Sequence, residues 1–287
     1  MLTSNVSQLH MDVLEAHGEC KVVVLVAHGL NLRAHALRDL YEPLRQRGAA
    51  IVVLRLRGHA SDSVGDAPML EEWKSIGATA WVEDWRESAR VAEELATSRG
   101  VPLAFLGYSL GALIHIYGLA TGERESSPFQ RQVLLAPAVR VRHRTRLVLL
   151  FRPLGRRFIV PSLTPAEIRS HGGTSIAAYE SLFGYEAALS ALDDPKRVKI
   201  PTLVLMAPGD ELVSQRRLVE WIERNGLRPE WRMRALSKDS ATAQSWVRHH
   251  IITKRGLGTA AFAALIQVIA DALIDGVMDA SADAHAI

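Results

Sequence analysis

Apolar residues along this chain gather in short continuous runs that alternate with stretches of helical spacing. The continuous runs occupy residues 21–27, 50–56, 101–106 and 132–136. The amphipathic stretches between them occupy residues 33–47 and 80–97. Runs without polar alternation are typical of strands covered on both faces, and a weaker alternation over 10–16 indicates an edge strand. The pattern predicts an α/β fold with a mostly parallel central sheet and helices on both faces.

This alternation stops between residues 140 and 196. Basic and aliphatic residues are mixed there, together with Pro153, Pro161 and Pro165. The pattern resumes with a predicted strand over 200–206, a helix over 213–225, a strand over 230–236 and a helix over 259–274. We therefore expect residues 1–139 and 197–287 to form one core. Residues 140–196 are expected to be an insertion over the carboxyl ends of the strands, where open α/β sheets carry their sites.

The composition of the 287 residues is that of an ordinary globular protein. The 34 lysines and arginines are nearly balanced by 31 acidic residues and lack interleaved aromatic residues, which argues against nucleic-acid binding. Cys20 is the only cysteine, so no internal disulfide can form, as suits a reducing cytoplasm. Neither a secretory signal nor a run of about 20 apolar residues is evident, so we expect a cytoplasmic protein without a membrane span. Residues 279–287 are expected to be a frayed tail.

One stretch, Ala104–Ile114, joins a buried strand, the spacing G-x-S-x-G and an apolar helix. A strand that turns sharply into a helix around a serine is a nucleophile elbow. The turn strains the backbone at Ser109, and glycines two positions away on either side avoid collisions there. The helix that begins at Leu110 directs its amides and the positive end of its dipole toward the serine. These features predict that Ser109 is a nucleophile, and a serine that merely caps a helix is the alternative.

A serine hydroxyl needs a base to take its proton and an acid to orient that base. Behind a nucleophile elbow these partners follow in the order acid, then histidine, each just after a strand. Asp210 comes soon after the strand that ends at Met206, with Glu211 as its neighbouring competitor. A helix cap or a surface turn is the alternative role for Asp210. After the strand that ends near Ala136 no acid follows until Glu167, so Asp210 is the predicted acid.

Three histidines follow the last predicted strand, namely His249, His250 and His285. His285 lies in the expected tail, and position alone does not separate the two adjacent residues. We choose His250 as the base, with His249 as the alternate. The reason is that His250 directly precedes Ile251 and Ile252, which could fix its ring near the core.

The other histidines suggest neither a base nor a metal site. His59 precedes the serine in the chain, and His115 lies one turn into the helix behind it, so neither fits the order of a triad. Both are expected to be structural. No spacing of histidines and acids matches H-E-x-x-H or a similar set of ligands, and we expect no metal.

The anionic oxygen of a tetrahedral intermediate needs two backbone donors. The amide of Leu110, the residue after the nucleophile, is expected to be one of them. The other is expected to be the amide of Leu30, in the loop after the strand over 21–27. Gly29 lets the backbone approach the substrate closely there, and His28 is expected to pin the loop.

These motifs together resemble the α/β-hydrolase-fold serine hydrolases, particularly the branch of monoacylglycerol lipases, lysophospholipases and serine aminopeptidase-like proteins. The matching pieces are HGL at 28–30, RGHASD at 57–62, LGYSLGAL at 106–113, LLAPA at 134–138, PTLVLMAPGDELV at 201–213 and HHII at 249–252. The resemblance implies a triad of Ser109, Asp210 and His250, and a helical cap between the fifth and sixth core strands. It also implies ester hydrolysis without metal or cofactor. Ala60 departs from the family, which often has glycine there.

Residues 140–160 have the most unusual composition in the chain, because seven arginines accompany aliphatic and aromatic residues. A basic, apolar cap could rest on an anionic membrane surface or receive a lipid with an acidic head group. Alternatively, the segment packs its apolar side on the core and leaves its arginines in solvent, since Pro153 and Gly155 interrupt any long amphipathic helix. Either arrangement favours an acyl chain as ligand over a sugar or a phosphate.

The sequence therefore predicts a carboxylesterase or a lipase for monoacylglycerols or lysophospholipids, acting through an acyl-enzyme on a small ester or lipid. An acyltransferase with the same triad is one alternative. A non-catalytic binding protein built on a hydrolase scaffold is another.

Overall fold

The computed structural model describes residues 11–59, 67–122, 126–162, 164–192, 196–244 and 247–278. Two parts of the sequence analysis lie outside the described residues. They are the second half of the RGHASD motif and the expected tail at 279–287, which includes His285. No helix among the described residues is long and apolar enough to cross a membrane.

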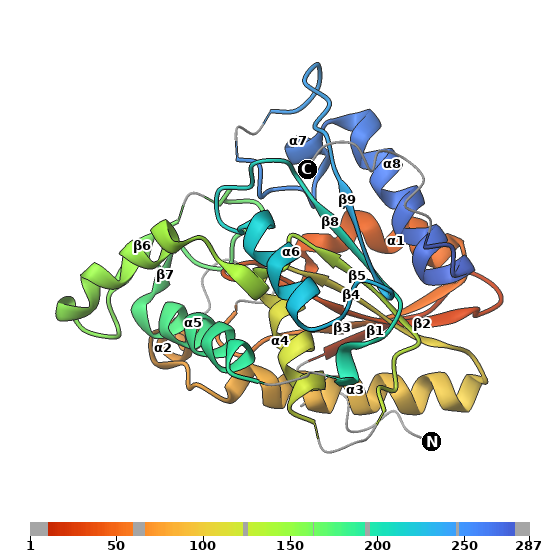
Figure 1. Ribbon diagram of the computed structural model, residues 1–287, viewed down its shortest axis with the longest axis horizontal. Coiled ribbons are helices and arrows are strands. Elements are labelled where there is room, and N and C mark those ends of the chain that lie inside the picture. The colour runs from red at the N-terminus through yellow and green to blue at the C-terminus, as the bar shows by residue number, and fades with distance from the viewer. Residues whose placement is uncertain are drawn as a thin grey trace.

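Seven strands form one twisted sheet at the centre of the molecule, in the order β1-β3-β2-β4-β5-β8-β9 (Figure 1). Their bounds are β1 (Met11–Leu14), β2 (Val22–Ala27), β3 (Ala49–Leu54), β4 (Leu103–Tyr108), β5 (Arg131–Leu135), β8 (Thr202–Met206) and β9 (Trp231–Ala235). Only β1 runs antiparallel to its neighbour, and the other pairs in this sheet are parallel. The predicted α/β fold with a mostly parallel sheet is confirmed, and β1 is the expected edge strand.

Helices cover both faces of the sheet, because strand side chains alternate between two apolar layers. In β2, for example, Val23 and Leu25 face one layer while Val22 and Val24 face the other. The first layer is covered by α3 (Ala80–Arg99), α4 (Leu110–Ala120) and α6 (Gln215–Arg224). The second is covered by η2 (Ala34–Leu37), α1 (Arg38–Gln46), α8 (Thr259–Ala270) and the π-helical turn η6 (Asp271–Asp275). Short helical turns complete the core at η3 (Ala138–Arg140), η5 (Lys196–Val198) and α7 (Lys254–Leu257).

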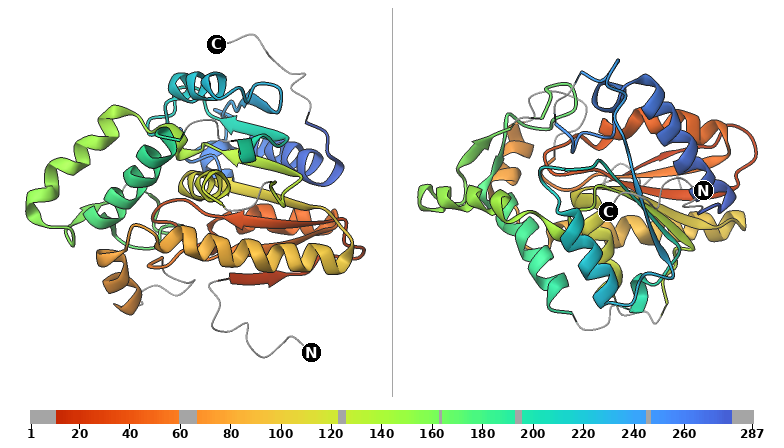
Figure 2. Two further views of the ribbon diagram at one scale, coloured as in Figure 1. Left: turned by 60° about the horizontal axis from the view of Figure 1, so that its bottom comes forward. Right: turned by 45° about the horizontal axis from the view of Figure 1, so that its top comes forward.

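The chain leaves the sheet between β5 and β8, and we call residues 140–196 the cap segment. It contains the 3₁₀ helix η4 (His143–Leu154), an antiparallel pair of β6 (Ile159–Pro161) and β7 (Gly173–Ser175), and α5 (Ile176–Ser190). Helix α5 packs on α4 and on α2, whereas η4 packs on α5 and extends away from the sheet (Figure 2). The cap segment is therefore layered, with α5 against the core and η4 outside it.

One helix, α2 (Ala67–Ser75), lies between the apolar run over 50–56 and the stretch over 80–97, where the pattern predicts no helix. Its burial is driven by Trp73, whose indole is enclosed in the core and donates a hydrogen bond to the carbonyl of Gly173 at 3.1 Å. Ser175 in turn donates to the Trp73 carbonyl at 2.6 Å. Contacts with a distant part of the chain stabilise this helix, and local sequence preference does not reveal them.

Candidate active site

Ser109 lies at the turn between β4 and α4, in a conformation that non-glycine residues rarely adopt. Its φ is 50° and its ψ is −109°. A side chain at Gly111 would come within 2.6 Å of backbone atoms of Ala27 and His28, and one at Gly107 would come within 2.9 Å of the Ala112 backbone. Both glycines are thus required for the close approach of α4 to the sheet. The predicted elbow is present, and it presents the Ser109 hydroxyl at the carboxyl edge of the sheet.

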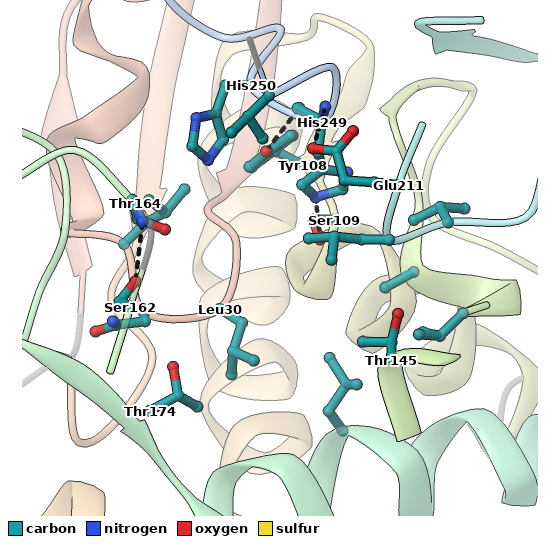
Figure 3. Close-up of a pocket in the computed structure, with 18 of the residues that line it drawn as sticks. Leu30, Tyr108, Ser109, Thr145, Ser162, Thr164, Thr174, Glu211, His249 and His250 are labelled. Carbon is teal, nitrogen blue, oxygen red and sulfur yellow. Dashed lines mark hydrogen bonds between the residues drawn. The ribbon is translucent and has the colours of Figure 1, made fainter. Parts of the chain in front are cut away.

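Three polar side chains from distant parts of the chain meet at this edge, and Figure 3 shows two of them, Ser109 and His249. The Nε2 atom of His249 lies 3.0 Å from Ser109 Oγ, and its Nδ1 atom lies 2.8 Å from Asp210 Oδ2. Asp210 follows β8, and His249 lies in the loop after β9. A neutral imidazole that donates from Nδ1 to Asp210 keeps Nε2 free to accept the serine proton.

The environment of Asp210 keeps its carboxylate charged. Burial alone would raise the pKa of Asp210, but His249 and two backbone amides outweigh it and hold the pKa below its ordinary value. These amides, from Leu212 and Val213, each donate to Oδ1 at 2.8 Å. One carboxylate oxygen is therefore fixed by the backbone, and the other is left to orient the imidazole.

The backbone of His249 is held from two sides. Glu211, the neighbouring acid, accepts hydrogen bonds from the amides of Arg248 and His249 at 3.1 and 3.2 Å. Tyr108 donates its hydroxyl proton to the His249 carbonyl at 2.9 Å. Glu211 thus positions the histidine loop and does not compete with Asp210 for the imidazole.

The preference for His250 is corrected by this geometry, since His249 occupies the position between Ser109 and Asp210. The chain turns at these residues, with the Ile251 amide donating to the His249 carbonyl at 2.9 Å, and Figure 3 shows the ring of His250 turned away from Ser109. Ile251 and Ile252 are fully buried, as expected, but the ring that reaches the serine is that of His249. Burial lowers the pKa of His250 to about 4, so its ring is neutral near pH 7.

The two expected oxyanion donors lie at the same edge of the sheet. Leu110 is the first residue of α4, so its amide has no carbonyl partner within the helix. Leu30 follows β2, and its side chain lines the cavity that also contains Ser109 and His249. The roles of Leu30 and Leu110 as oxyanion donors stay a prediction.

The loop that carries Leu30 is clamped to the cap segment by Asn31, whose φ is 54°. The Asn31 side chain accepts from the amide of His171 at 2.9 Å and donates to the His171 carbonyl at 3.1 Å. The Asn31 carbonyl accepts from the amide of Ser170 at 2.9 Å. Next along the chain, Leu32 forms a β-bridge with Arg169. The loop after β2 and residues 169–171 therefore form one hydrogen-bonded unit.

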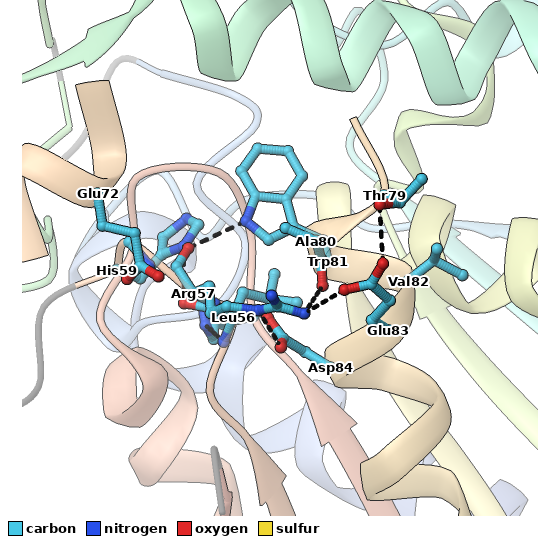
Figure 4. Close-up of polar contacts among 12 residues, drawn as sticks. Leu56, Arg57, His59, Glu72, Thr79, Ala80, Trp81, Val82, Glu83 and Asp84 are labelled. Carbon is cyan, nitrogen blue, oxygen red and sulfur yellow. Dashed lines mark hydrogen bonds and ion pairs between the residues drawn. The ribbon is translucent and has the colours of Figure 1, made fainter. Parts of the chain in front are cut away.

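His59 supports the same loop from below, as a structural residue. Its Nε2 atom accepts a hydrogen bond from the Asn31 amide at 3.2 Å. Arg57 anchors the turn around it, donating from its backbone and from Nε to Asp84 at 2.8 and 2.6 Å (Figure 4). The Trp81 indole donates to the Arg57 carbonyl at 3.0 Å. His28 also acts structurally: its Nε2 accepts from the Leu56 amide at 3.3 Å.

Residues of both the core and the cap segment line the cavity over Ser109, whose volume is about 260 Å³. Its walls are largely apolar, with contributions from Leu30, Val141, Ile168, Leu182 and Val213. Glu211 is the only acidic residue among the described residues that line it. Within the described part of the chain, no group of three or more histidine, cysteine, aspartate or glutamate residues could hold a metal ion.

Sequence reasoning did not single out Asn31 or Tyr108. Tyr108 lies at a variable position of the G-x-S-x-G spacing, and its hydrogen bond to His249 joins residues 141 positions apart. Asn31 follows the HGL motif directly, and a polar residue after an apolar strand was a usable signal. Its partner in the cap segment, however, could not be inferred from local pattern.

Comparisons with known proteins place the chain in a family and agree with its fold. The family model described as "Serine aminopeptidase, S33" matches residues 18–182, more than half of the chain. A structure of the metagenome-derived lipolytic enzymes LipS and LipT is 25% identical, with a TM-score of 0.62, covering 79% of this chain and 87% of that one. Monoglyceride lipase from Saccharomyces cerevisiae, a soluble variant in complex with a substrate analogue, is 13% identical, with a TM-score of 0.69, covering 92% and 91%.

Monoacylglycerol lipase from Paleococcus ferrophilus is 17% identical, with a TM-score of 0.65, covering 94% of this chain and 100% of that one. Such low identities support a shared fold and do not indicate which substrate this chain acts on. A search among curated proteins found no match.

Proposed function

Because the chain belongs to the serine aminopeptidase (S33) family of α/β hydrolases, we propose that it hydrolyses carboxylic esters with Ser109 as nucleophile, His249 as base and Asp210 as orienting acid. The observation that carries the proposal is the continuous line of hydrogen bonds from Ser109 Oγ through His249 to Asp210, at 3.0 and 2.8 Å. The alignment is the one that activates a serine hydroxyl for acyl transfer.

In the first half of the reaction, Ser109 Oγ attacks the ester carbonyl carbon as its proton passes to His249 Nε2. The carbonyl oxygen becomes an anion, which the amides of Leu30 and Leu110 are proposed to stabilise. The bond between that carbon and the alcohol oxygen then breaks, and His249 returns its proton to the departing alcohol. Asp210 stabilises the imidazolium in between, and the acyl group stays on Ser109.

In the second half, a water molecule takes the place of the alcohol. His249 accepts its proton as the water oxygen attacks the acyl carbon, and the bond to Ser109 Oγ breaks as the proton moves to the serine. A free carboxylic acid leaves. No step requires a metal or a redox group from the protein.

The cavity favours an ester over a peptide with a free amino terminus. Recognition of a terminal ammonium group needs a carboxylate within the site. The only acid among the described lining residues is Glu211, and both of its oxygens already accept backbone hydrogen bonds. The apolar walls offer a complementary surface to an acyl chain instead.

The cap segment completes the substrate site in this proposal. Residues 1–139 and 197–287 serve as the catalytic core, and residues 140–196 close over it. Val141, Ile168 and Leu182 supply part of the apolar wall from the cap side. An ester or lipid with an aliphatic acyl group would contact this wall, while the alcohol portion would face the polar residues around Ser109.

Turnover of a series of p-nitrophenyl esters tests the proposal, with Ser109→Ala as the control. We expect hydrolysis that depends on Ser109 and that varies with acyl length. If no chain length is turned over but a fluorophosphonate still labels Ser109, the ester assignment is wrong and the nucleophile stands. If neither occurs, a non-catalytic scaffold explains the chain better. Adding an alcohol or amine acceptor separates an acyltransferase, which would give more transfer product than free acid.

A further inference from the structure

The outer surface of the cap segment exposes large apolar side chains, although the Phe151 ring stacks on that of Phe158 with 5.8 Å between the ring centroids. None of the twelve residues of η4 is buried. Leu147 and Leu154 are each 60% exposed, Leu150 is 74% exposed and Phe151 is 45% exposed. Core helices of this protein bury such residues completely, as Leu113 and Ile114 of α4 show. Exposed apolar groups gathered on one projecting element mark an interaction site.

Arginines border these apolar residues. Arg152, Arg156 and Arg157 have side chains that are about 60% exposed. Arg152 and Arg156 share a single carboxylate, that of Glu180, at 2.8 and 2.7 Å. Arg157 pairs with Glu71, which also pairs with Lys74. Arg144 donates only to the backbone carbonyl of Glu211 among the described residues. The cations outnumber the carboxylates, so the rim carries net positive charge.

We propose that η4 and its arginines form a docking surface for an anionic lipid membrane. The exposed leucines and Phe151 would enter the boundary of the acyl chains, and the arginines would contact phosphates of the head groups. A second copy of this chain fits less well, because a symmetric pairing would place two basic rims against each other. The charge therefore selects an anionic lipid surface as the occupant.

The position of η4 relates this surface to the cavity over Ser109. Thr145, in the first turn of η4, lines that cavity, while Leu150 and Leu154 do not. A docked protein would hold the edge of its cavity at the membrane, where lipid esters are concentrated. The docking surface goes beyond ester hydrolysis itself, since it does not depend on which ester is cleaved.

Co-flotation with vesicles tests the proposal, using the full chain with Ser109→Ala so that no lipid is hydrolysed. One set of vesicles is phosphatidylcholine alone, and in the other set one lipid in three is phosphatidylglycerol. We expect binding to the anionic vesicles that weakens as salt is added. Leu150→Glu with Leu154→Glu should reduce it more than about tenfold, since burying a leucine side chain contributes a larger factor than that. Arg156→Gln and Arg157→Gln should each reduce it about fivefold.

The matched control is Val277→Glu, because Val277 is also an exposed apolar residue, 49% exposed, and follows η6, which packs on β5 of the core. It should leave binding unchanged. In the catalytic background, Leu150→Glu with Leu154→Glu should leave turnover of a water-soluble ester unchanged, which shows that the fold is intact. Equal binding to both kinds of vesicle, unchanged binding after the leucine substitutions, or dimerisation that those substitutions abolish would overturn the proposal. Absence of ester turnover with intact flotation would count against the proposed function alone.

Discussion

The carboxyl edge of the sheet and the cap segment are held in place by different interactions. At the edge, backbone hydrogen bonds from Ser109 to Leu135 and from Ala136 to Leu205, at 2.9 and 2.8 Å, extend the ladders of neighbouring parallel strands. The position of Ser109 relative to Asp210 is therefore set by strand register. Residues that are 101 positions apart in the chain are brought to the two sides of one imidazole.

The cap segment depends more on side chains. Glu186 of α5, which is buried, accepts from the Val141 amide at 3.1 Å and pairs with Arg146 at 2.6 Å. Arg140 is buried beside the Trp221 ring, with its guanidinium carbon 5.3 Å from the ring centroid, and burial lowers its pKa to about 10. These contacts fix the base of the segment and hold η4 through Arg146, but no residue of η4 is buried.

The two regions thus meet different requirements, a fixed catalytic geometry at the sheet edge and an exposed contact surface in η4. A catalytic group must stay within a fraction of an ångström of its partner, and a parallel ladder supplies that constraint. A surface that contacts a deformable partner such as a membrane needs exposed side chains of the right polarity. It does not need the fixed spacing that strand pairing provides. Substitutions at the edge should consequently affect chemistry, and those in η4 should affect contacts with other molecules.

The largest expected effect separates the two adjacent histidines. His249→Ala should lower kcat for a p-nitrophenyl ester by about 10⁴-fold or more, because it removes the group that takes the serine proton. His250→Asn should change kcat less than about threefold, since its ring points away from Ser109. Steady-state kinetics on both variants check this. A loss after His250→Asn as large as that after His249→Ala would contradict the assignment.

The next contrast compares one leucine in each region. Leu113→Ala, in the buried face of α4, should lower the free energy of unfolding by about 2–5 kcal/mol because it leaves a cavity in a packed core. Leu150→Ala makes the same substitution at an exposed position in η4. It should change the free energy of unfolding by less than about 0.5 kcal/mol. Urea unfolding followed by tryptophan fluorescence measures both. Similar losses for the two variants would mean that η4 is buried in solution.

Asn31→Ala tests the connection between the two regions. It removes both side-chain hydrogen bonds to His171, so the loop that carries Leu30 loses its clamp. We expect kcat to fall about fivefold, from a lost contribution near 1 kcal/mol, with KM changed less. Asn225→Ala is the matched control, because Asn225 also donates to a backbone carbonyl, that of Trp221, but lies at the end of α6. Equal effects on kcat from the two asparagines would argue against a positioning role for Asn31.

The last prediction concerns the dependence of stability on acid, with a small share from each of several buried histidines. Burial lowers the pKa of His28 and of His250 to about 4 and that of His115 to about 3. Below the unfolded value of about 6.5 the unfolded chain binds protons that the folded chain does not, so stability falls as pH drops from there toward the folded pKa. Between pH 7.5 and 5.5 each histidine should cost about 1 kcal/mol. Urea titrations at both pH values measure the loss, and His250→Asn should make it smaller by one histidine's share.

The buried core and the acid were accessible from sequence because each has a local signature. Continuous apolar runs located the strands β2 to β5 and β8 within about two residues, as is usual for boundaries. Asp210 was found because it follows such a run at the edge where sites collect. The need for Gly107 and Gly111 also follows from the sequence, because a sharp turn around a serine leaves no room for side chains at these positions.

Other features depend on contacts that local pattern does not contain. Which of His249 and His250 faces Ser109 depends on the path of the loop that carries them. Glu211 and Tyr108, which lie outside this loop, fix that path by hydrogen bonds to the backbone of His249. The helix α2 forms because Trp73 is buried against β7. The sequence does not distinguish a packed from an exposed arrangement of η4, because its mixed arginines and leucines are compatible with both.

Three non-glycine residues with positive φ stand at the ends of three neighbouring strands: Asn31 at 54° after β2, Ser109 at 50° after β4 and Ala136 at 42° after β5. Each such backbone costs about 1–3 kcal/mol, which is a sizeable share of the net stability of a typical domain. Glycine would relieve this backbone strain, but at Asn31 and Ser109 it would also remove the side chain that the site uses. Gains in heat resistance at these positions are therefore the ones most apt to cost activity. Libraries aimed at stability are better placed elsewhere in the chain.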